Sequence, residues 1–199
     1  MMASTSCAQV YEVRTKHHTS GKPHPNKVAI TKLEAARRQL ETAITLWFHD
    51  ADPVSIHTLV MAAHGILRPL NKQRRGQPML GDPGPHIRPA LEKRVADMFA
   101  ESSNFFKHGA KDSLATHYFA PEINHCMIVD ACDAYMLVAQ EKRPLMLTFA
   151  FYVALHEPGL FRQEFVDSTQ PFSAAKQLSK SKFVAEFLPA YSRVTGGQF

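Results

Sequence analysis

The sequence lacks most of the short motifs by which enzymes and metal-binding proteins are recognised. It contains no G-x-S-x-G element, no P-loop and no G-x-G-x-x-G turn, which removes the commonest hydrolase and nucleotide-binding explanations. Its three cysteines lack C-x-x-C spacing, so we expect them to be reduced, with neither a zinc site nor a disulfide. The half-signature Glu122-x-x-His125 of di-iron bundles has no second copy. We therefore expect no metal and no cofactor.

Long apolar runs are also missing. The first 27 residues hold no uninterrupted apolar stretch of the kind that a secretory signal needs, and the longest later one, at 145–155, is too short to cross a bilayer. Strict two-residue alternation, which marks half-buried strands, is not sustained, and no repeat of solenoid period is present. These absences predict a soluble, cytoplasmic, helical protein that does not associate with a membrane.

The positive charge is concentrated in two segments. The net charge is +5, and residues 68–94 alone hold seven Lys or Arg against two acids, while residues 1–27 hold four against one. Such a distribution would attract phosphate groups, but it equally fits a solvated tail and a solvated loop. If the loop binds nucleic acid, the candidate residues are Arg68, Lys72, Arg74 and Arg75.

Helical periodicity dominates the rest of the chain. Apolar residues recur at helical spacing over 28–48 and again from about 53 to 68. Between these helices, Asp52 is placed to cap the second one and Pro53 to occupy its first position. Further helices are expected at about 89–108, at 121–142, in PLMLTFAFYVALHE and in SAAKQLSKSKFVAEFLPAY.

Two segments complete the predicted architecture. Residues 69–89 contain five prolines and three glycines, which indicates a long exposed loop. Residues 121–142 are apolar around most of the helical circumference, which predicts the central, most buried helix. The sequence thus predicts an all-α, single-domain bundle of about six helices over 28–199, preceded by a flexible basic tail at 1–27.

A polar cluster marks the end of the helix predicted at 89–108. Lys107 and His108, followed by Gly109, fit a helix C-terminus, where cations are favoured and glycine adopts the left-handed conformation. This interpretation leaves Asn104 unexplained, because asparagine is a mediocre helix former and lies one turn before His108 on the same face. The two side chains could therefore share a hydrogen bond or a ligand.

The stretch SNFFKH (103–108) resembles the Arg-x4-6-His signature of the HEPN superfamily of helical bundles. Many members are metal-independent ribonucleases of toxin–antitoxin and phage-defence systems, with a site in a cleft between two subunits. The resemblance implies a homodimer in which His108 assists proton transfer at the RNA 2′-hydroxyl, while Asn104 and Lys107 position phosphate. Ser103 stands in the place of the arginine and cannot supply a bidentate phosphate clamp.

A second constellation joins two of the predicted helices. His57 and His64 lie on one stripe of the second helix, about 10.5 Å apart along its axis, which is too far to hold one metal ion. Asp130 and Asp133 lie in the apolar segment 121–142 and need partners if they are buried. If the two helices pack side by side, a His–Asp pair forms inside the bundle, either as a structural bridge or as a catalytic or ligand-orienting pair.

Functions of two classes follow from these observations. The first is a bacterial, HEPN-like bundle that binds RNA or acts on it as a metal-independent ribonuclease. The alternative is a non-enzymatic helical interaction domain, or a small-ligand pocket lined by His57, His64 and Asp130. The segment KLEAARRQLETAITLWFHDADPVSIHTLVMAAHGIL is also similar to a group of uncharacterised bacterial proteins.

Overall fold

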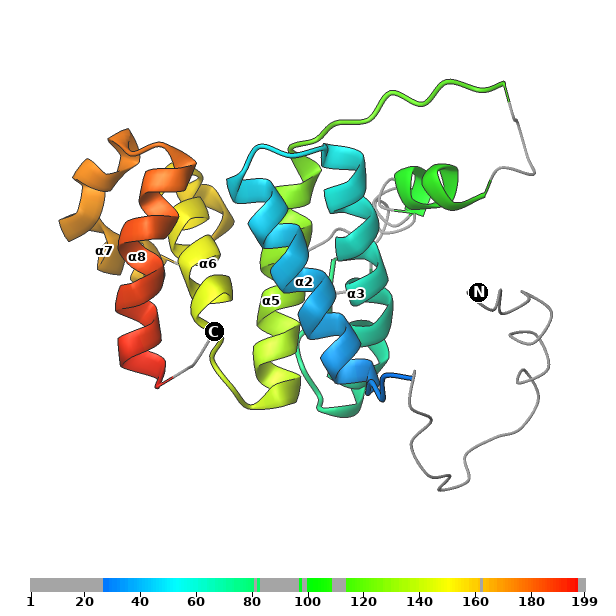
Figure 1. Ribbon diagram of the computed structural model, residues 1–199, viewed down its shortest axis with the longest axis horizontal. Helices are drawn as coiled ribbons and strands as arrows, with labels where there is room; N and C mark the ends of the chain where they lie inside the picture. The colour runs from blue at the N-terminus through cyan, green and yellow to red at the C-terminus, as the bar shows by residue number, and fades with distance from the viewer. Residues whose placement is uncertain are drawn as a thin grey trace, which may run out of the picture. The chain divides into compact units, whose positions relative to one another are not determined.

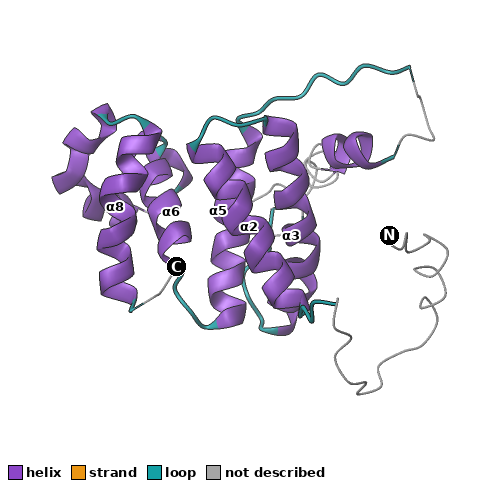
Figure 2. Ribbon diagram, viewed as in Figure 1, coloured by secondary structure: helices purple, strands orange, loops and turns teal. Residues whose placement is uncertain are grey.

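The structure is a computed structural model that describes residues 27–80, 82, 97, 100–108, 114–161 and 163–196. Every regular element in these ranges is a helix, and they contain no strand (Figure 2). The predicted all-α fold is therefore confirmed. The predicted basic tail lies outside the described residues except for Lys27. In the described ranges, no helix has both the length and the apolar character needed to span a bilayer.

The helices follow one another from the blue to the red end of the chain in Figure 1. A helical segment without a label, residues 100–107, is drawn in green beside α3 (Figure 1). The remaining elements are α2 (Lys32–Phe48), α3 (Pro53–Gln73), α5 (Ile123–Ala139), α6 (Pro144–His156), η1 (Pro158–Leu160), α7 (Gln163–Thr169), η2 (Gln170–Gln177) and α8 (Lys180–Thr195).

Side-chain caps fix the starts of α2 and α3. The Thr31 hydroxyl accepts a hydrogen bond from the Glu34 N–H at 3.1 Å, and α2 begins one residue after Thr31. The Asp52 carboxylate accepts one from the Ser55 N–H at 2.8 Å, with Pro53 in the first turn of α3. The predicted cap and the predicted start of the second helix are therefore confirmed.

The helix α3 ends later than the sequence predicts. The loop predicted at 69–89 does not begin at Pro69, because α3 continues through this proline to Gln73. Proline removes the donor for the carbonyl of the residue four positions earlier, here Gly65. Both Pro69 and Gly65 are exposed, so water can satisfy that carbonyl. Of the loop that remains, residues 81 and 83–89 lie outside the described residues.

The most buried helix is α6 and not α5, as the segment 121–142 predicted. Nine of the 13 residues of α6 are buried, against eight of the 17 residues of α5. The two helices pack against each other, and α5 also packs on α2 and α3 while α6 packs on α8. Because α6 has neighbours on more of its circumference, almost no polar side chain is tolerated there.

Aromatic rings join α2, α6 and α8 in the core. The Trp47 ring lies edge-on to Phe149 and Tyr152, with centroids 5.0 and 5.1 Å apart. Phe183 of α8 is fully buried and stacks on Phe187 at 4.5 Å. Ring pairs of this geometry add about 0.5–1.5 kcal/mol each beyond their buried area.

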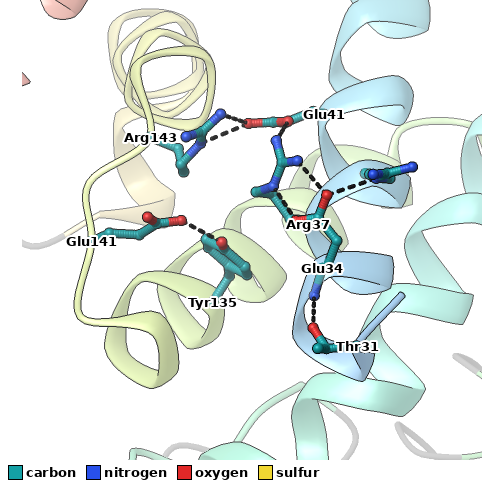
Figure 3. Close-up of polar contacts among 8 residues, drawn as sticks. Thr31, Glu34, Arg37, Glu41, Tyr135, Glu141 and Arg143 are labelled. Carbon is teal, nitrogen blue, oxygen red and sulfur yellow. Dashed lines mark hydrogen bonds and ion pairs between the residues drawn. The ribbon is translucent and has the colours of Figure 1, made fainter. Parts of the chain in front are cut away.

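A network of ion pairs connects α2 to the start of α6 (Figure 3). Glu41 lies between two arginines. One of its oxygens accepts a hydrogen bond from Arg37 at 2.5 Å, and the other accepts one from Arg143 Nε at 2.8 Å and forms an ion pair with Arg143 Nη2 at 2.7 Å. Arg37 also forms two parallel hydrogen bonds with Glu34. Hydrogen bonds from Arg37 and Arg38 lower the pKa of Glu34 to about 2.

Candidate functional site

His57 is fully buried in the bundle and forms a hydrogen bond with Asn124 of α5. Its side chain has no exposed surface, and Nδ1 lies 2.9 Å from the Asn124 side-chain oxygen. The Asn124 amide nitrogen donates to the Pro53 carbonyl, so its oxygen accepts and His57 Nδ1 must donate. His57 Nε2 is then an acceptor without a hydrogen-bond partner. Burial lowers the pKa of His57, and the nearby charges of Lys107 and His117 act in the same direction.

His64 forms the predicted pair with Asp130. Its Nε2 lies 2.6 Å from Asp130 Oδ2, and the Leu80 N–H donates to the same oxygen at 3.1 Å. The histidine is only 1% exposed, so the pair lies at the inner edge of the α3–α5 contact. Asp133 is exposed on α5. The predicted His–Asp contact is therefore confirmed, and its position favours the structural bridge, because His64 has almost no surface for a ligand.

The segment after α3 is folded back onto the helix rather than extended into solvent. Arg68 donates to the Leu80 carbonyl at 2.8 Å, and the Asn71 amide donates to the Gln77 carbonyl at 2.8 Å. Arg68 Nε also lies 3.1 Å from Asp82, at an angle unsuited to a hydrogen bond. Arg68, predicted to bind nucleic acid, thus holds a loop in place. Because Arg68 already pairs with Leu80 and Asp82, less of its positive charge is available to a phosphate group.

The other basic residues predicted to bind nucleic acid are exposed. Lys72, Arg74 and Arg75 stand at the C-terminal end of α3, with Arg75 in the left-handed conformation at φ 56°. A pocket of about 430 Å³ lies beside them. It is lined by Arg68, Asn71, Lys72, Gly76, Gln77, Pro78 and Asp82.

The helical segment 100–107 has one buried and one exposed face. Ser102 and Ser103 are 7% and 6% exposed, whereas Asn104, Lys107 and His108 all face solvent. The predicted catalytic residues therefore share a surface at the end of this segment. His108 donates its backbone N–H to the Asn104 carbonyl at 3.0 Å, while Gly109 lies outside the described residues. The predicted proton-transfer role of His108 stays a prediction.

The two phenylalanines of this segment differ in exposure. Phe105 is 42% exposed. Phe106 takes the inner position instead, with its ring edge-on to His57 at 5.8 Å and to Phe119 at 5.3 Å. Helical geometry explains the difference, because adjacent residues point about 100° apart and Phe106 already occupies the face toward α3.

Two residues near this segment, His117 and Tyr118, were not predicted from the sequence. His117 Nε2 lies 2.8 Å from the Ser102 hydroxyl, and the His117 ring is 5.2 Å from that of Phe105. Tyr118 follows and is 93% exposed. The sequence signal that could have found them is the run of three aromatic side chains in THYF (116–119), which is unusual for a solvent-exposed loop.

The predicted site residues do not meet in one cleft. His57 lies beneath Phe106, and His64 with Asp130 lies two turns further along α3. Arg74 is 17 residues after His57, or about 25 Å along the axis. Asn104, Lys107 and His108 therefore form one surface with Phe105, which we call the helix-end surface, and the basic residues of α3 form another.

The described residues contain no group of three or more His, Cys, Asp or Glu placed to hold a metal. Cys126 and Cys132 are free thiols, as predicted, and burial raises the pKa of both. Cys7 lies outside the described residues. Comparison with known proteins returns no family model, no curated protein and no solved structure that matches the chain.

Proposed function

We propose that the protein binds single-stranded RNA through the helix-end surface, in the manner of a HEPN-like bundle. The observation that carries the proposal is the presence of an exposed aromatic ring, Phe105, on the same helical turn as an exposed amide, an ammonium group and an imidazole. Aromatic rings stack with unpaired bases, and cations beside them hold the backbone.

Binding is better supported than cleavage. Ser103, which stands where the HEPN arginine would be, is 6% exposed and cannot reach a phosphate. Arg68, the arginine within α3, cannot replace it readily, because it is already paired with Leu80 and Asp82. His108 would then act as a hydrogen-bonding group for RNA. Cleavage would require a second cation, which the partner subunit of the proposed homodimer would have to supply.

The test is fluorescence anisotropy with a labelled single-stranded oligouridine. Phe105→Ala should weaken binding about tenfold, since a base–aromatic stack contributes roughly 1–3 kcal/mol. Lys107→Ala should lower the slope of log K against log salt by about 0.7, as expected for one phosphate contact in a single strand. Lys182→Ala removes an exposed charge from α8 and is the matched control.

Two results would contradict the proposal. The first is the absence of binding by the wild-type protein at low salt, and the second is equal binding by the Phe105→Ala, Lys107→Ala and Lys182→Ala variants. The same samples report on cleavage. If intact RNA is lost with the wild type but not with His108→Ala, the ribonuclease form of the proposal is supported.

A protein-interaction domain remains the alternative function. Leu114 and Tyr118 are 97% and 93% exposed, so both side chains are accessible to a protein partner. Sedimentation of the wild type and of Leu114→Asp separates the two functions. A dimer that dissociates in the variant, together with unchanged RNA binding, would assign Leu114 to the subunit contact and separate it from the RNA-binding surface.

A further inference from the structure

A second concave site lies on the α2, α6 and α8 side of the molecule. It is a pocket of about 340 Å³, within the size range of small-molecule sites. Its lining divides into an apolar set and a polar set. The apolar residues are Phe48, Pro144, Leu145, Val184 and Leu188, and the polar residues are Arg37, Glu41, Thr45, His49 and Arg143.

In the polar set, Arg143 has hydrogen-bond donors that Glu41 does not use. Arg37 uses Nε and Nη2 on Glu34 and Nη1 on Glu41, so all three of its nitrogens are occupied. Arg143 meets Glu41 only through Nε and Nη2, which form one edge of its guanidinium (Figure 3). Glu41 does not use the end of the group that carries Nη1, and this end has the N–H donors that a carboxylate requires.

The charge of the lining favours an anion. Glu34 and Glu41 both pair with Arg37, whereas Arg143 pairs with Glu41 alone, so Arg143 carries the positive charge that is least compensated. Arg143 is also the residue at which α6 starts, and no side chain caps this helix. The α6 dipole therefore adds a smaller contribution of the same sign.

We propose that this pocket binds a small amphipathic carboxylate, with the apolar part against Phe48, Leu145 and Val184 and the carboxylate on the Nη1 end of Arg143. The proposal concerns a different surface from the RNA-binding one and does not depend on it. An alcohol with the same hydrocarbon chain would keep the apolar contacts but lose the charge-assisted hydrogen bond. It should bind at least about tenfold more weakly.

The fluorescence of Trp47 can report binding in this pocket. Trp47 is the single tryptophan of the chain, and its ring lies 5.2 Å from that of Phe48, a wall of the pocket. Titration with decanoate should therefore change the tryptophan emission and saturate. Decanol and decyltrimethylammonium are the matched probes without the negative charge.

Three variants test the assignment. Arg143→Met should weaken decanoate binding about tenfold and leave decanol binding unchanged. Val184→Phe fills the pocket without changing charge and should abolish the binding of both probes. Arg38→Met is the control, because Arg38 pairs with Glu34 in the same network but does not line the pocket. Circular dichroism and thermal unfolding establish that each variant is folded.

The outcomes are distinct. Saturable decanoate binding that is lost in Val184→Phe, reduced in Arg143→Met and retained in Arg38→Met supports the proposal. No binding of decanoate by the wild type overturns it. Equal affinity for decanoate and decanol, or an Arg143→Met variant with wild-type affinity for decanoate, overturns the anionic part. If Arg143→Met does not fold, the comparison of the charged and uncharged probes on the wild type decides.

Discussion

Two polar seams connect helices that are far apart in the sequence, and they differ in how much water reaches them. In the α3–α5 seam, His57 and His64 meet Asn124 and Asp130, and both histidines are at most 1% exposed. In the α2–α6 seam, Glu41 meets Arg37 and Arg143, and these side chains keep about a fifth of their surface exposed.

This difference determines what each seam contributes. A group left without its partner in the α3–α5 seam would stay desolvated, so the pairing there must be satisfied from within the protein. In the α2–α6 seam, water and salt can replace a lost partner, so the same number of hydrogen bonds contributes less stability. The more exposed α2–α6 seam is also the one in which an arginine, Arg143, has donors that its ion-pair partner does not use. The following predictions test this contrast.

Loss of Asp130 should have the largest effect. Asp130→Ala removes the acceptor of both His64 Nε2 and the Leu80 N–H. We expect the free energy of unfolding to fall by about 3 kcal/mol, measured by urea denaturation. Asp133→Ala changes an exposed residue of the same helix and should cost less than about 1 kcal/mol. Equal losses in the two variants would contradict the contrast between the seams.

Gly76 tests whether the segment after α3 is as tightly held as its hydrogen bonds indicate. A Cβ added at Gly76 would lie 1.9 Å from the Asn71 side-chain oxygen, and Asn71 is itself buried. Gly76→Ala should therefore destabilise the protein by about 2 kcal/mol. A Cβ at Gly65 on α3 meets nothing within 4 Å, so Gly65→Ala should stabilise the protein by up to about 1 kcal/mol. Thermal unfolding of the pair gives both signs in one experiment.

The α2–α6 seam should respond less to the same kind of change. Glu41→Ala removes the residue shared by Arg37 and Arg143. The expected loss is about 1.5 kcal/mol in 0.1 M NaCl and smaller in 1 M NaCl, because solvated charges are screened. Arg38→Ala removes an arginine that is 54% exposed and should cost less than about 0.5 kcal/mol. A loss at Glu41 that equals the loss at Asp130 would show that exposure does not separate the seams.

The sequence predicted those features that local signals determine. The Asp52 cap follows from neighbouring residues. Polar positions on two otherwise apolar helices predicted a His–Asp pair, but they did not determine that His64 would meet Asp130 while His57 meets Asn124. The pair of Glu41 and Arg143 is separated by 102 residues, and no local pattern relates them. The continuation of α3 through Pro69 and the exposure of Tyr118 likewise depend on where water and neighbouring elements lie. Sequence periodicity does not contain that information.

The smallest predicted effect is a pH dependence of stability that comes from His57. Its pKa in the folded protein lies below the ordinary value of 6.5, because burial disfavours the charged ring and Lys107 and His117 add positive charge nearby. The unfolded chain therefore binds a proton as the pH falls below about 6.5 while the folded protein does not, so this contribution to stability is complete above that pH and decreases below it. His57→Gln should flatten the dependence of the melting temperature on pH between 7 and 5, with His49→Gln as the exposed control. Identical slopes in the wild type and His57→Gln would show that the buried imidazole is not the group that titrates, and would leave the α3–α5 seam distinguished from the α2–α6 seam by its hydrogen bonds alone.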